Sequence, residues 1–212
     1  MSEISVRGYH IKEYVYNTII VGTGAAGYNG AHRLYSNGQK DIAIVTEHRL
    51  AGTSRNTGSD KQTYYKLSLG GGEADSVYEM AQTLFAGGCM DGDNALVEAA
   101  LSAGSFLHLA ELGVPFPTNR YGEYVGYKTD HDPRCRASSA GPLTSKLMVE
   151  ALEQAVDFLN IPVYDGYQVI RILTEQDICK GLLCLNINRK EDENGCYVLF
   201  RCKNVLYATG GP

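Results

Sequence analysis

The sequence predicts an α/β fold in which helices flank a parallel sheet and an antiparallel three-stranded β-meander is inserted before the last strand. Three observations support this prediction. Near the N-terminus a strand, a helix and a second strand follow one another over about 30 residues, as in a βαβ unit. Three strand-like runs joined by polar turns lie near the C-terminus, and a final apolar run ends in glycines.

The N-terminal elements are the most strongly marked. Residues 14–21 form a run of aromatic and β-branched side chains, which predicts one buried strand. A glycine-rich turn ends this run, and residues 25–37 then predict a helix that Gly38 closes at its C-cap. Residues 41–46 predict the second strand.

Helices are expected in the middle of the chain, after a polar, glycine-punctuated stretch from 47 to 72 whose length is typical of a functional or a disordered loop. They cover 74–86, then a segment from an Asp93 N-cap to Leu112, then one with Pro142 in its first turn. The inward face of the second is expected to hold Leu96, Ala100, Ala103, Leu107 and Ala110. That of the third is expected to hold Leu147, Ala151, Leu152, Ala155 and Leu159. Lys61 and Lys66 are expected to be solvated.

The C-terminal part changes character. Residues 167–173, 178–187 and 195–202 predict the three strands of the meander. Residues 204–211 predict a last strand that runs into Gly210 and Gly211.

Composition excludes several classes of protein. The 212 residues are 44% hydrophobic and 20% charged, as in a globular domain, and contain no run of about 18 apolar residues, so no membrane insertion is expected. Residues 1–14 contain no apolar run typical of a secretory signal, so none is expected there. Six scattered cysteines without a C-x-x-C pair favour reduced thiols in a cytoplasmic protein and argue against a metal site. A formal charge of −5 gives no indication of nucleic-acid binding.

The spacing Gly22-x-Gly24-x-x-Gly27 carries the chemistry. After a strand and before a helix, these glycines permit a tight turn, close approach of a diphosphate to the backbone, and helix–strand packing. The acidic Glu47 follows about 20 residues later, at the end of the second strand, where a carboxylate can accept hydrogen bonds from a ribose. The pattern predicts a Rossmann-like dinucleotide site, and it fits NAD and FAD equally. The alternative is a plain glycine turn with an exposed glutamate.

A resemblance separates the two cofactors. The residues that carry it are Asp75-Ser76, Gly87-Gly88, Asp91, Val97, Leu109-x-x-Leu112-Gly113-Val114-Pro115-Phe116, the loop Gly52-Thr53-Ser54-Arg55-Asn56-Thr57-Gly58 and the ending Tyr207-Ala208-Thr209-Gly210-Gly211. In this order they resemble the succinate dehydrogenase and fumarate reductase flavoprotein group, which includes L-aspartate oxidase. The resemblance implies a Rossmann-like FAD-binding fold and a flavin-dependent oxidoreductase that passes a hydride to or from a C–C bond next to a carboxylate.

The resemblance also implies roles for residues. Gly22, Gly24, Ala25, Ala26 and Gly27 would contact the FAD diphosphate, and Glu47 the adenosine ribose. Those expected along the flavin or its ribityl chain are Thr53, Ser54, Asn56, Thr57 and Gly58. Val169 would contact adenine, or is a plain core residue, and Ala208, Thr209 and Gly210 would lie near the cofactor. Some members of the group attach FAD through a histidine in this loop. No histidine occurs here between His48 and His108, so the FAD is expected to be non-covalent.

The candidate catalytic residues are His131, Arg134 and Arg136, in a loop that resembles a "His, a few residues, Arg" segment of the group. An arginine there would bind a substrate carboxylate, and His131 would assist proton transfer. The alternative is an exposed turn of mutually paired Asp and Arg side chains.

The resemblance further implies that residues 1–212 are the N-terminal part of an FAD-binding domain, with a capping domain and the C-terminal half expected beyond Pro212. A small carboxylate is the implied substrate, and an iron–sulfur or other electron-transfer protein the implied partner. Two alternatives are an FAD-holding electron-transfer subunit without its own substrate site, and an NAD-binding domain.

Overall fold

The computed structural model describes residues 2–6, 8–70, 72, 74–130, 132–192 and 195–211. The chain forms two compact units. The first unit consists of residues 1–56 and 152–212, and the second unit consists of residues 57–151.

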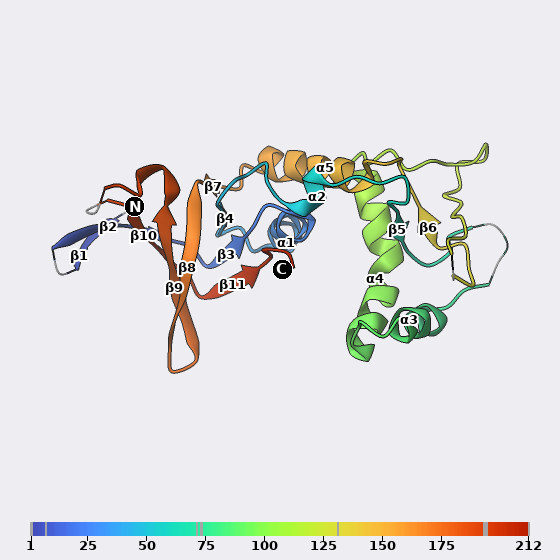
Figure 1. The fold of residues 1–212 in the computed structure, drawn as a ribbon, viewed down its shortest axis with the longest axis horizontal. Helices are drawn as coiled ribbons and strands as arrows, with labels where there is room; N and C mark the ends of the chain where they lie inside the picture. The colour runs from blue at the N-terminus through green and yellow to red at the C-terminus, as the bar shows by residue number, and fades with distance from the viewer. Residues whose placement is uncertain are drawn as a thin grey trace. The chain divides into compact units, whose positions relative to one another are not determined.

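The first unit is built on a four-stranded parallel sheet (Figure 1), which confirms the predicted α/β class. Its strands, in spatial order, are β11 (Asn204–Tyr207), β3 (Thr18–Val21), β4 (Ile42–Thr46) and β7 (Val163–Asp165). Helix α1 (Ala25–Ser36) packs on this sheet, where a Cβ atom on Gly27 would lie 3.6 Å from Cγ2 of Ile20. Gly38, at φ +95°, follows the helix as predicted.

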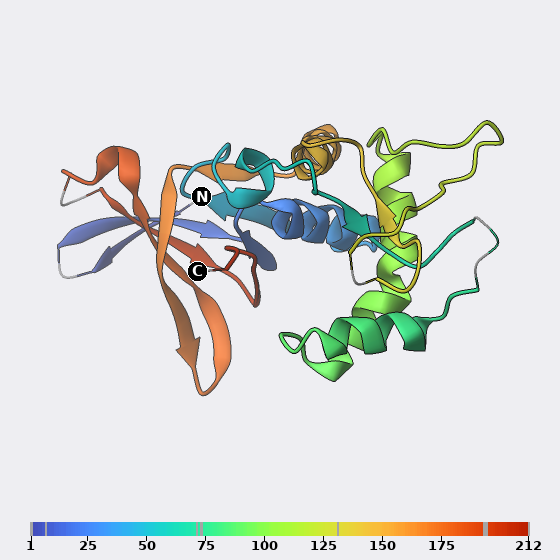
Figure 2. The same ribbon diagram turned by 45° about the vertical axis from the view of Figure 1, so that its right-hand side comes forward.

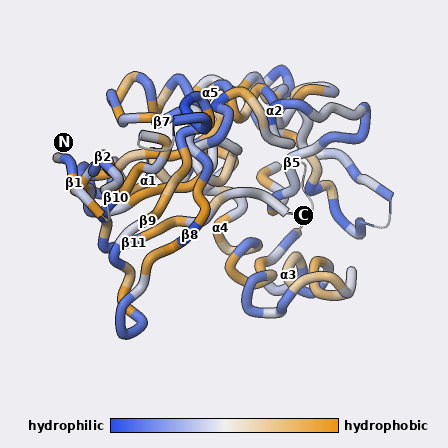
Figure 3. The backbone as a smooth tube through the Cα atoms, turned by 60° about the vertical axis from the view of Figure 1, so that its left-hand side comes forward, coloured by the Kyte–Doolittle hydropathy of each residue, from blue (hydrophilic) through white to orange (hydrophobic). Residues whose placement is uncertain are grey.

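The meander belongs to a second sheet in the same unit. Its strands, in spatial order, are β1 (Ser2–Val6), β2 (Tyr9–Val15), β10 (Tyr197–Arg201), β9 (Ile178–Asn186) and β8 (Tyr167–Glu175). The antiparallel order β8, β9, β10 confirms the predicted meander. Figure 2 shows the long β8–β9 hairpin, and Figure 3 shows that its turn is hydrophilic whereas its strands are largely hydrophobic.

The single strand predicted for residues 14–21 is wrong, because the chain changes sheets inside it. β2 ends at Val15 and pairs in parallel with β10, whereas β3 begins at Thr18 and pairs in parallel with β11. At the step between them, the amides of Asn17 and Thr18 both donate to the carbonyl of Asp41. Tyr14 and Val15 at the end of β2 favour extended structure as β3 does, so a β-propensity pattern contains no sign of the break.

The core of the first unit lies between its two sheets. Ile19, Val21, Ala43 and Val45 project from the parallel sheet toward Leu182, Cys184, Val198 and Phe200 of the other. Alternation along β3 explains this arrangement, since successive side chains of a strand point to opposite faces. Ile19 and Val21 therefore face the meander, and Ile20 faces α1. The glycine turn that follows Val21 is fixed to a strand held on both faces.

The second unit contains two packed helices, α3 (Val77–Ala86) and α4 (Gly92–Glu111), and a short antiparallel pair, β5 (Tyr64–Tyr65) with β6 (Ala137–Ser138). Helix α5 (Thr144–Phe158) runs across the division at residue 152, and Pro142 lies in the turn before it rather than in its first turn. On α5, Ala151 and Leu152 are buried as predicted, together with Val149 and Val156.

Two details of α4 correct the expectations. Asp91, not Asp93, caps the helix, since its carboxylate accepts hydrogen bonds from the amides of residues 93 and 94. The buried face is shifted by one position and consists of Ala95, Ala99, Ser102, Phe106 and Leu109. Leu96 and Leu107 are instead exposed. Apolar side chains occur on more than one face of α4, so the spacing of apolar residues in the sequence could not identify the buried face.

Lys66 is another correction, because it is fully buried rather than solvated. Its ammonium group lies 4.7 Å from the centre of the Phe106 ring and donates a hydrogen bond to the carbonyl of Leu67. Burial lowers the pKa of this lysine.

Candidate functional site

The glycine turn is closely packed at two of its three glycines. Gly22 has φ +109°, and a Cβ atom there would lie 2.4 Å from the carbonyl oxygen of Ala208. A Cβ atom on Gly27 would lie 2.0 Å from the carbonyl oxygen of Gly22. Both positions therefore require glycine for the fold itself. Gly24 differs: its φ is −78°, and a Cβ atom there would meet only Oγ of Ser54, at 3.5 Å. The absence of a side chain at Gly24 therefore keeps the backbone accessible.

The N-terminus of α1 carries an uncompensated positive dipole. Gly24 is the N-cap and has no side chain to accept hydrogen bonds from the helix, and the first turn contains no acidic residue. Within this turn, the amide of Ala25 donates to Oγ of Ser54 at 3.4 Å. Free amides and the helix dipole together favour an anion at such an end.

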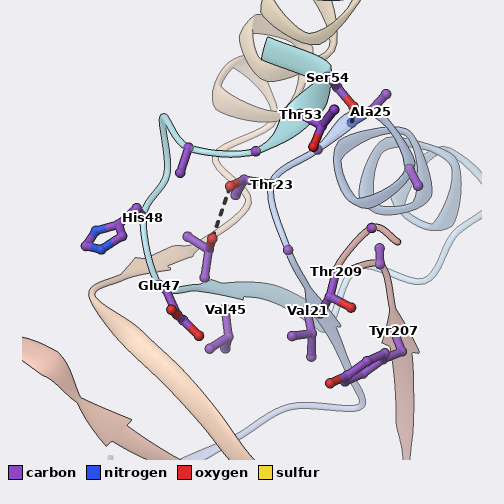
Figure 4. A pocket seen from close by; sticks show the side chains of 18 of the residues that line it. Val21, Thr23, Ala25, Val45, Glu47, His48, Thr53, Ser54, Tyr207 and Thr209 are labelled. Carbon is purple, nitrogen blue, oxygen red and sulfur yellow. Dashed lines mark hydrogen bonds between the residues drawn. The ribbon is translucent and has the colours of Figure 1, made fainter. Parts of the chain in front are cut away.

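A cavity of about 750 Å³ adjoins this helix end. Figure 4 shows the side chains around it, which come from the ends of β3, β4 and β11 and from α2 (Thr53–Asn56). The carboxyl ends of three neighbouring parallel strands thus meet at the cavity, which is where ligands bind in open α/β sheets. The volume lies within the range of small-molecule and cofactor sites.

Glu47 lies in this cavity, directly after β4. Its side chain is exposed, and Figure 4 shows that it points away from that of its neighbour His48. The preceding residue, Thr46, shares a buried hydrogen bond of 3.1 Å with Thr23 of the glycine turn. This bond fixes the segment that carries Glu47 to the turn that carries Gly24.

Most of the predicted cofactor residues line the cavity: Gly22, Gly24, Ala25, Ala26, Glu47, Thr53, Ser54, Val169, Ala208, Thr209 and Gly210. The structure therefore brings together residues from five separate segments of the chain. Gly27 is not a lining residue and packs under the turn instead. Asn56 is not one either, since its amide group donates to the carbonyls of Leu50 and Gly52. Thr57 and Gly58 belong to the second unit, where Gly58 packs against Pro142 and Leu143.

Several lining residues were not predicted from the sequence: Val21, Thr23, Val45, Thr46, His48, Ala51, Gly52, Tyr167, Tyr207 and Gly211. Those at strand ends, such as Thr46 and Tyr207, follow from one rule that the sequence permits. Every residue at the carboxyl end of a predicted parallel strand is a candidate for the ligand side. Tyr167 carried no such signal, because it comes from the meander.

Polar contacts hold the short helix α2 in place. Nη2 of Arg55 lies 2.5 Å from Oε2 of Glu153 on α5. The other oxygen, Oε1, accepts hydrogen bonds from Tyr28 of α1 at 2.9 Å and from Nε of Arg49 at 2.8 Å. Burial opposes ionisation of Glu153, but the hydrogen bonds from Arg49, Tyr28 and Arg55 outweigh it and hold the pKa below its ordinary value. One ionised carboxylate thus joins three segments of the first unit.

The candidate catalytic arginines lie in the second unit, and His131 lies outside the described residues. Arg134 pairs at 2.8 Å with Glu79. Arg136 is fully buried, and its guanidinium group donates to both carboxylate oxygens of Asp75, at 2.7 and 2.9 Å. It also donates to the hydroxyl group of Tyr65 and, at 3.4 Å, to Asp132. Both arginines are therefore paired with acidic side chains, although the turn is not fully exposed.

The Arg136 network changes the ionisation of its partner. Burial would raise the pKa of Asp75, but hydrogen bonds from Arg136 and from the amides of Ser68 and Ser76 outweigh that effect and lower it. Arg136 therefore pairs with an ionised carboxylate inside the second unit.

None of the helices within the described residues combines the length and the apolar character needed to cross a lipid bilayer. The same residues contain no cluster of three or more His, Cys, Asp or Glu side chains able to hold a metal ion.

Comparison with known proteins links this chain to a family. A family model described as "FAD binding domain" matches residues 17–212. L-Aspartate oxidase of Agrobacterium fabrum is 30% identical over 197 residues, which cover 92% of this chain and 35% of that protein. The succinate dehydrogenase flavoprotein subunit of Rickettsia conorii is 25% identical over 215 residues, which cover 97% and 35% respectively. The chain spans about a third of the length of these relatives.

Solved structures show the same fold. A variant of E. coli quinol fumarate reductase FrdA superposes with a TM-score of 0.78 at 21% identity, covering 95% of this chain and 33% of that chain. The open conformation of a flavocytochrome c3 fumarate reductase superposes with a TM-score of 0.73 at 18% identity, covering 93% and 34%.

Proposed function

Because the chain belongs to the FAD binding domain family, we propose that it forms the FAD-holding part of a fumarate reductase-like or succinate dehydrogenase-like oxidoreductase. The observation that carries this proposal is the cavity at the N-terminus of α1, where Gly24 leaves the backbone open and Glu47 lies at the end of the adjacent strand. A diphosphate and its neighbouring ribose fit that pair of features.

In this proposal the chain binds and orients the cofactor. The N-terminal amides of α1 at Ala25, Ala26 and Gly27, with the tight turn at Gly22 and the open backbone at Gly24, would hold the diphosphate. Glu47 would accept hydrogen bonds from the ribose, and Val169 would lie against adenine. Thr53 and Ser54 would lie along the flavin or its ribityl chain, and Ala208, Thr209 and Gly210 would lie near the cofactor. When bound, FAD supplies the hydride-transfer chemistry, while the protein sets its orientation and surroundings.

The proposed reaction is hydride transfer between the flavin and a C–C bond next to a carboxylate. The names of the relatives, an aspartate oxidase and succinate dehydrogenase flavoprotein subunits, support a small carboxylate as substrate. An iron–sulfur or other electron-transfer protein is the proposed partner. We propose residues 1–212 as the N-terminal part of the FAD domain, with the substrate side completed by a capping domain and the rest of that domain. Six unpaired cysteines support a cytoplasmic location.

His131, Arg134 and Arg136 stay candidates for the substrate side. The acidic partners of both arginines favour a structural role for this loop over direct binding of substrate. A variant of Arg136 assayed in an active, longer enzyme separates these roles, because loss of substrate affinity with normal flavin content and wild-type stability would indicate direct binding.

Absorption spectroscopy of the purified chain tests the proposal. We expect bands near about 370 and 450 nm, which are general properties of a bound flavin. Stoichiometric FAD uptake by the apoprotein is the matching titration. A colourless protein that takes up NAD but not FAD would replace the flavin assignment with the NAD-binding alternative. Acid precipitation tests the mode of attachment: the flavin should remain in the supernatant, and flavin in the protein pellet would show a covalent bond.

A second candidate is an FAD-holding electron-transfer subunit whose substrate site lies on another polypeptide. Reading the coding sequence beyond residue 212 separates the two: a capping domain on the same gene favours the enzyme.

A further inference from the structure

Helix α2 lines the proposed cofactor cavity without being packed into the core. Thr53 and Ser54 both face the cavity, yet none of the four residues of α2 is buried. Apolar packing therefore contributes little to its position, and a single helical turn is not stable by itself. Its hydrogen bonds and ion pairs must set where Thr53 and Ser54 lie.

Among the contacts that connect α2 to other elements of the first unit, those of Ser54 and Arg55 differ in strength. Oγ of Ser54 accepts a hydrogen bond from the amide of Ala25 at the start of α1, at 3.4 Å. Nη2 of Arg55 donates to Glu153 at 2.5 Å, with only 11% and 15% of the two side chains exposed. The first contact is long and neutral, whereas the second is short, charged and shielded from water. The Arg55–Glu153 pair is therefore the stronger restraint.

Glu153 is itself firmly oriented. Its carboxylate is fixed by Tyr28 and by Arg49. Arg49 in turn bonds to Asp157, one turn further along α5, and its backbone amide donates to Asp165 at the end of β7. Glu153 is thus anchored to α1, to the segment after β4 and, through Arg49, to the parallel sheet. Through these contacts, Glu153 fixes α2 relative to the parallel sheet.

We propose that Glu153 is a positioning residue for the cofactor: through Arg55 it holds α2 against the N-terminus of α1, so that Thr53 and Ser54 meet the flavin side of FAD. Glu153 is not a lining residue of the cavity, so it acts through Arg55 and not by touching the cofactor. This inference rests on the proposed function, because it assumes that FAD occupies the cavity.

Three variants of the 212-residue chain test the proposal. Arg55→Met removes the link to α2 and leaves Tyr28 and Arg49 on Glu153, so it keeps the test valid even if Glu153→Gln folds poorly. Glu153→Gln removes the charge. Glu150→Gln is the matched control, because Glu150 lies on the same helix in an exposed pair with Lys146 at 3.9 Å.

The first measurement needs no cofactor. Hydrogen–deuterium exchange of residues 51–58 in the apoprotein should become faster in Arg55→Met and Glu153→Gln, and unchanged in Glu150→Gln. Unaltered exchange in both test variants would overturn the proposal, since α2 would then be held without the pair.

The second measurement compares FAD with ADP, which has the adenosine and diphosphate but lacks the flavin. FAD affinity should fall at least about tenfold in both test variants, while ADP affinity falls less than about threefold. The double variant should be no weaker than the worse single variant, because both remove one interaction. Equal losses for FAD and ADP, or no loss, would reduce Glu153 to a stabilising residue and reject the positioning role.

The outcomes also separate this inference from the function beneath it. A wild-type chain that binds no FAD would overturn the proposed function and the cofactor-positioning role together, and the exchange data would still decide whether Glu153 anchors α2. A wild-type chain that binds FAD, with affinity untouched in both variants, would overturn only the inference.

Discussion

The hydroxyl groups of Thr23 and Thr46 lie 3.1 Å apart and share a hydrogen bond at the end of the parallel sheet, where both residues are buried. Thr23 belongs to the glycine turn, and Thr46 is the last residue of β4, immediately before Glu47. The bond therefore sets the distance between the two groups proposed to hold the diphosphate and the ribose.

Replacing Thr23 by Val should weaken both the fold and the site. The change leaves the hydroxyl group of Thr46 buried without this partner, which should reduce the free energy of unfolding by about 1–3 kcal/mol. FAD affinity should fall as well, because Glu47 is no longer held in register with the turn. Urea unfolding and FAD titration measure the two effects. Thr174→Val, at an exposed position of β8, is the control and should alter neither. Stability and affinity equal to wild type in Thr23→Val would mean that the bond has no role.

Replacing Arg136 by Ala should strongly destabilise the second unit. The change leaves the ionised Asp75 buried without its bidentate partner, and breaking a buried ion pair in this way costs about 3–5 kcal/mol. Arg134→Ala removes a partly exposed pair and should cost less than about 1 kcal/mol. Urea unfolding of both variants provides the comparison. Equal, small effects would contradict a structural role and favour Arg136 as a substrate ligand.

Replacing Lys66 by Met should stabilise the second unit and change its pH dependence. Burial lowers the pKa of Lys66 from its ordinary value of 10.5, so the unfolded chain binds more protons between the two pKa values. Stability should therefore rise with pH in that interval for the wild type. Lys66→Met removes the ionisable group, so its thermal midpoint should exceed that of the wild type at neutral pH, and the difference should shrink as the pH approaches 10.5. A lower midpoint for Lys66→Met throughout would contradict this account.

The parts of the site that could be predicted from the sequence are those encoded over short distances. The turn from Gly22 to Gly27 and the position of Glu47 follow from a strand, a helix and a strand in succession. The number of residues between the glycines and Glu47 was therefore enough to predict that they lie at the same end of the sheet. The meander could be predicted as well, because its three strand-like runs are joined by polar turns.

The rest depends on contacts between distant residues. Arg55 meets Glu153 across 98 positions of sequence, and no local pattern indicates that pairing. Lys66 looks like a solvated lysine until Phe106 is placed beside it. The change of sheets at Asn17 is set by the carbonyl of Asp41, which a propensity pattern does not contain. Contacts between residues distant in sequence determine all three features, and the secondary-structure propensity of single residues predicts such contacts poorly.

Gly24→Ala tests the central claim most directly. Compared with Gly22→Ala, it distinguishes an effect on ligand binding from an effect on folding. Gly22→Ala should destabilise the protein severely, since its Cβ would lie 2.4 Å from Ala208 at a φ of +109°. Gly24→Ala meets only Ser54 at 3.5 Å and has a φ of −78°, so the free energy of unfolding of the apoprotein should change by less than about 1 kcal/mol. Its Cβ would instead occupy the approach to the backbone that a diphosphate needs. The account predicts that Gly24→Ala keeps wild-type stability and loses FAD affinity by more than about tenfold; FAD binding as tight as in the wild type would contradict it.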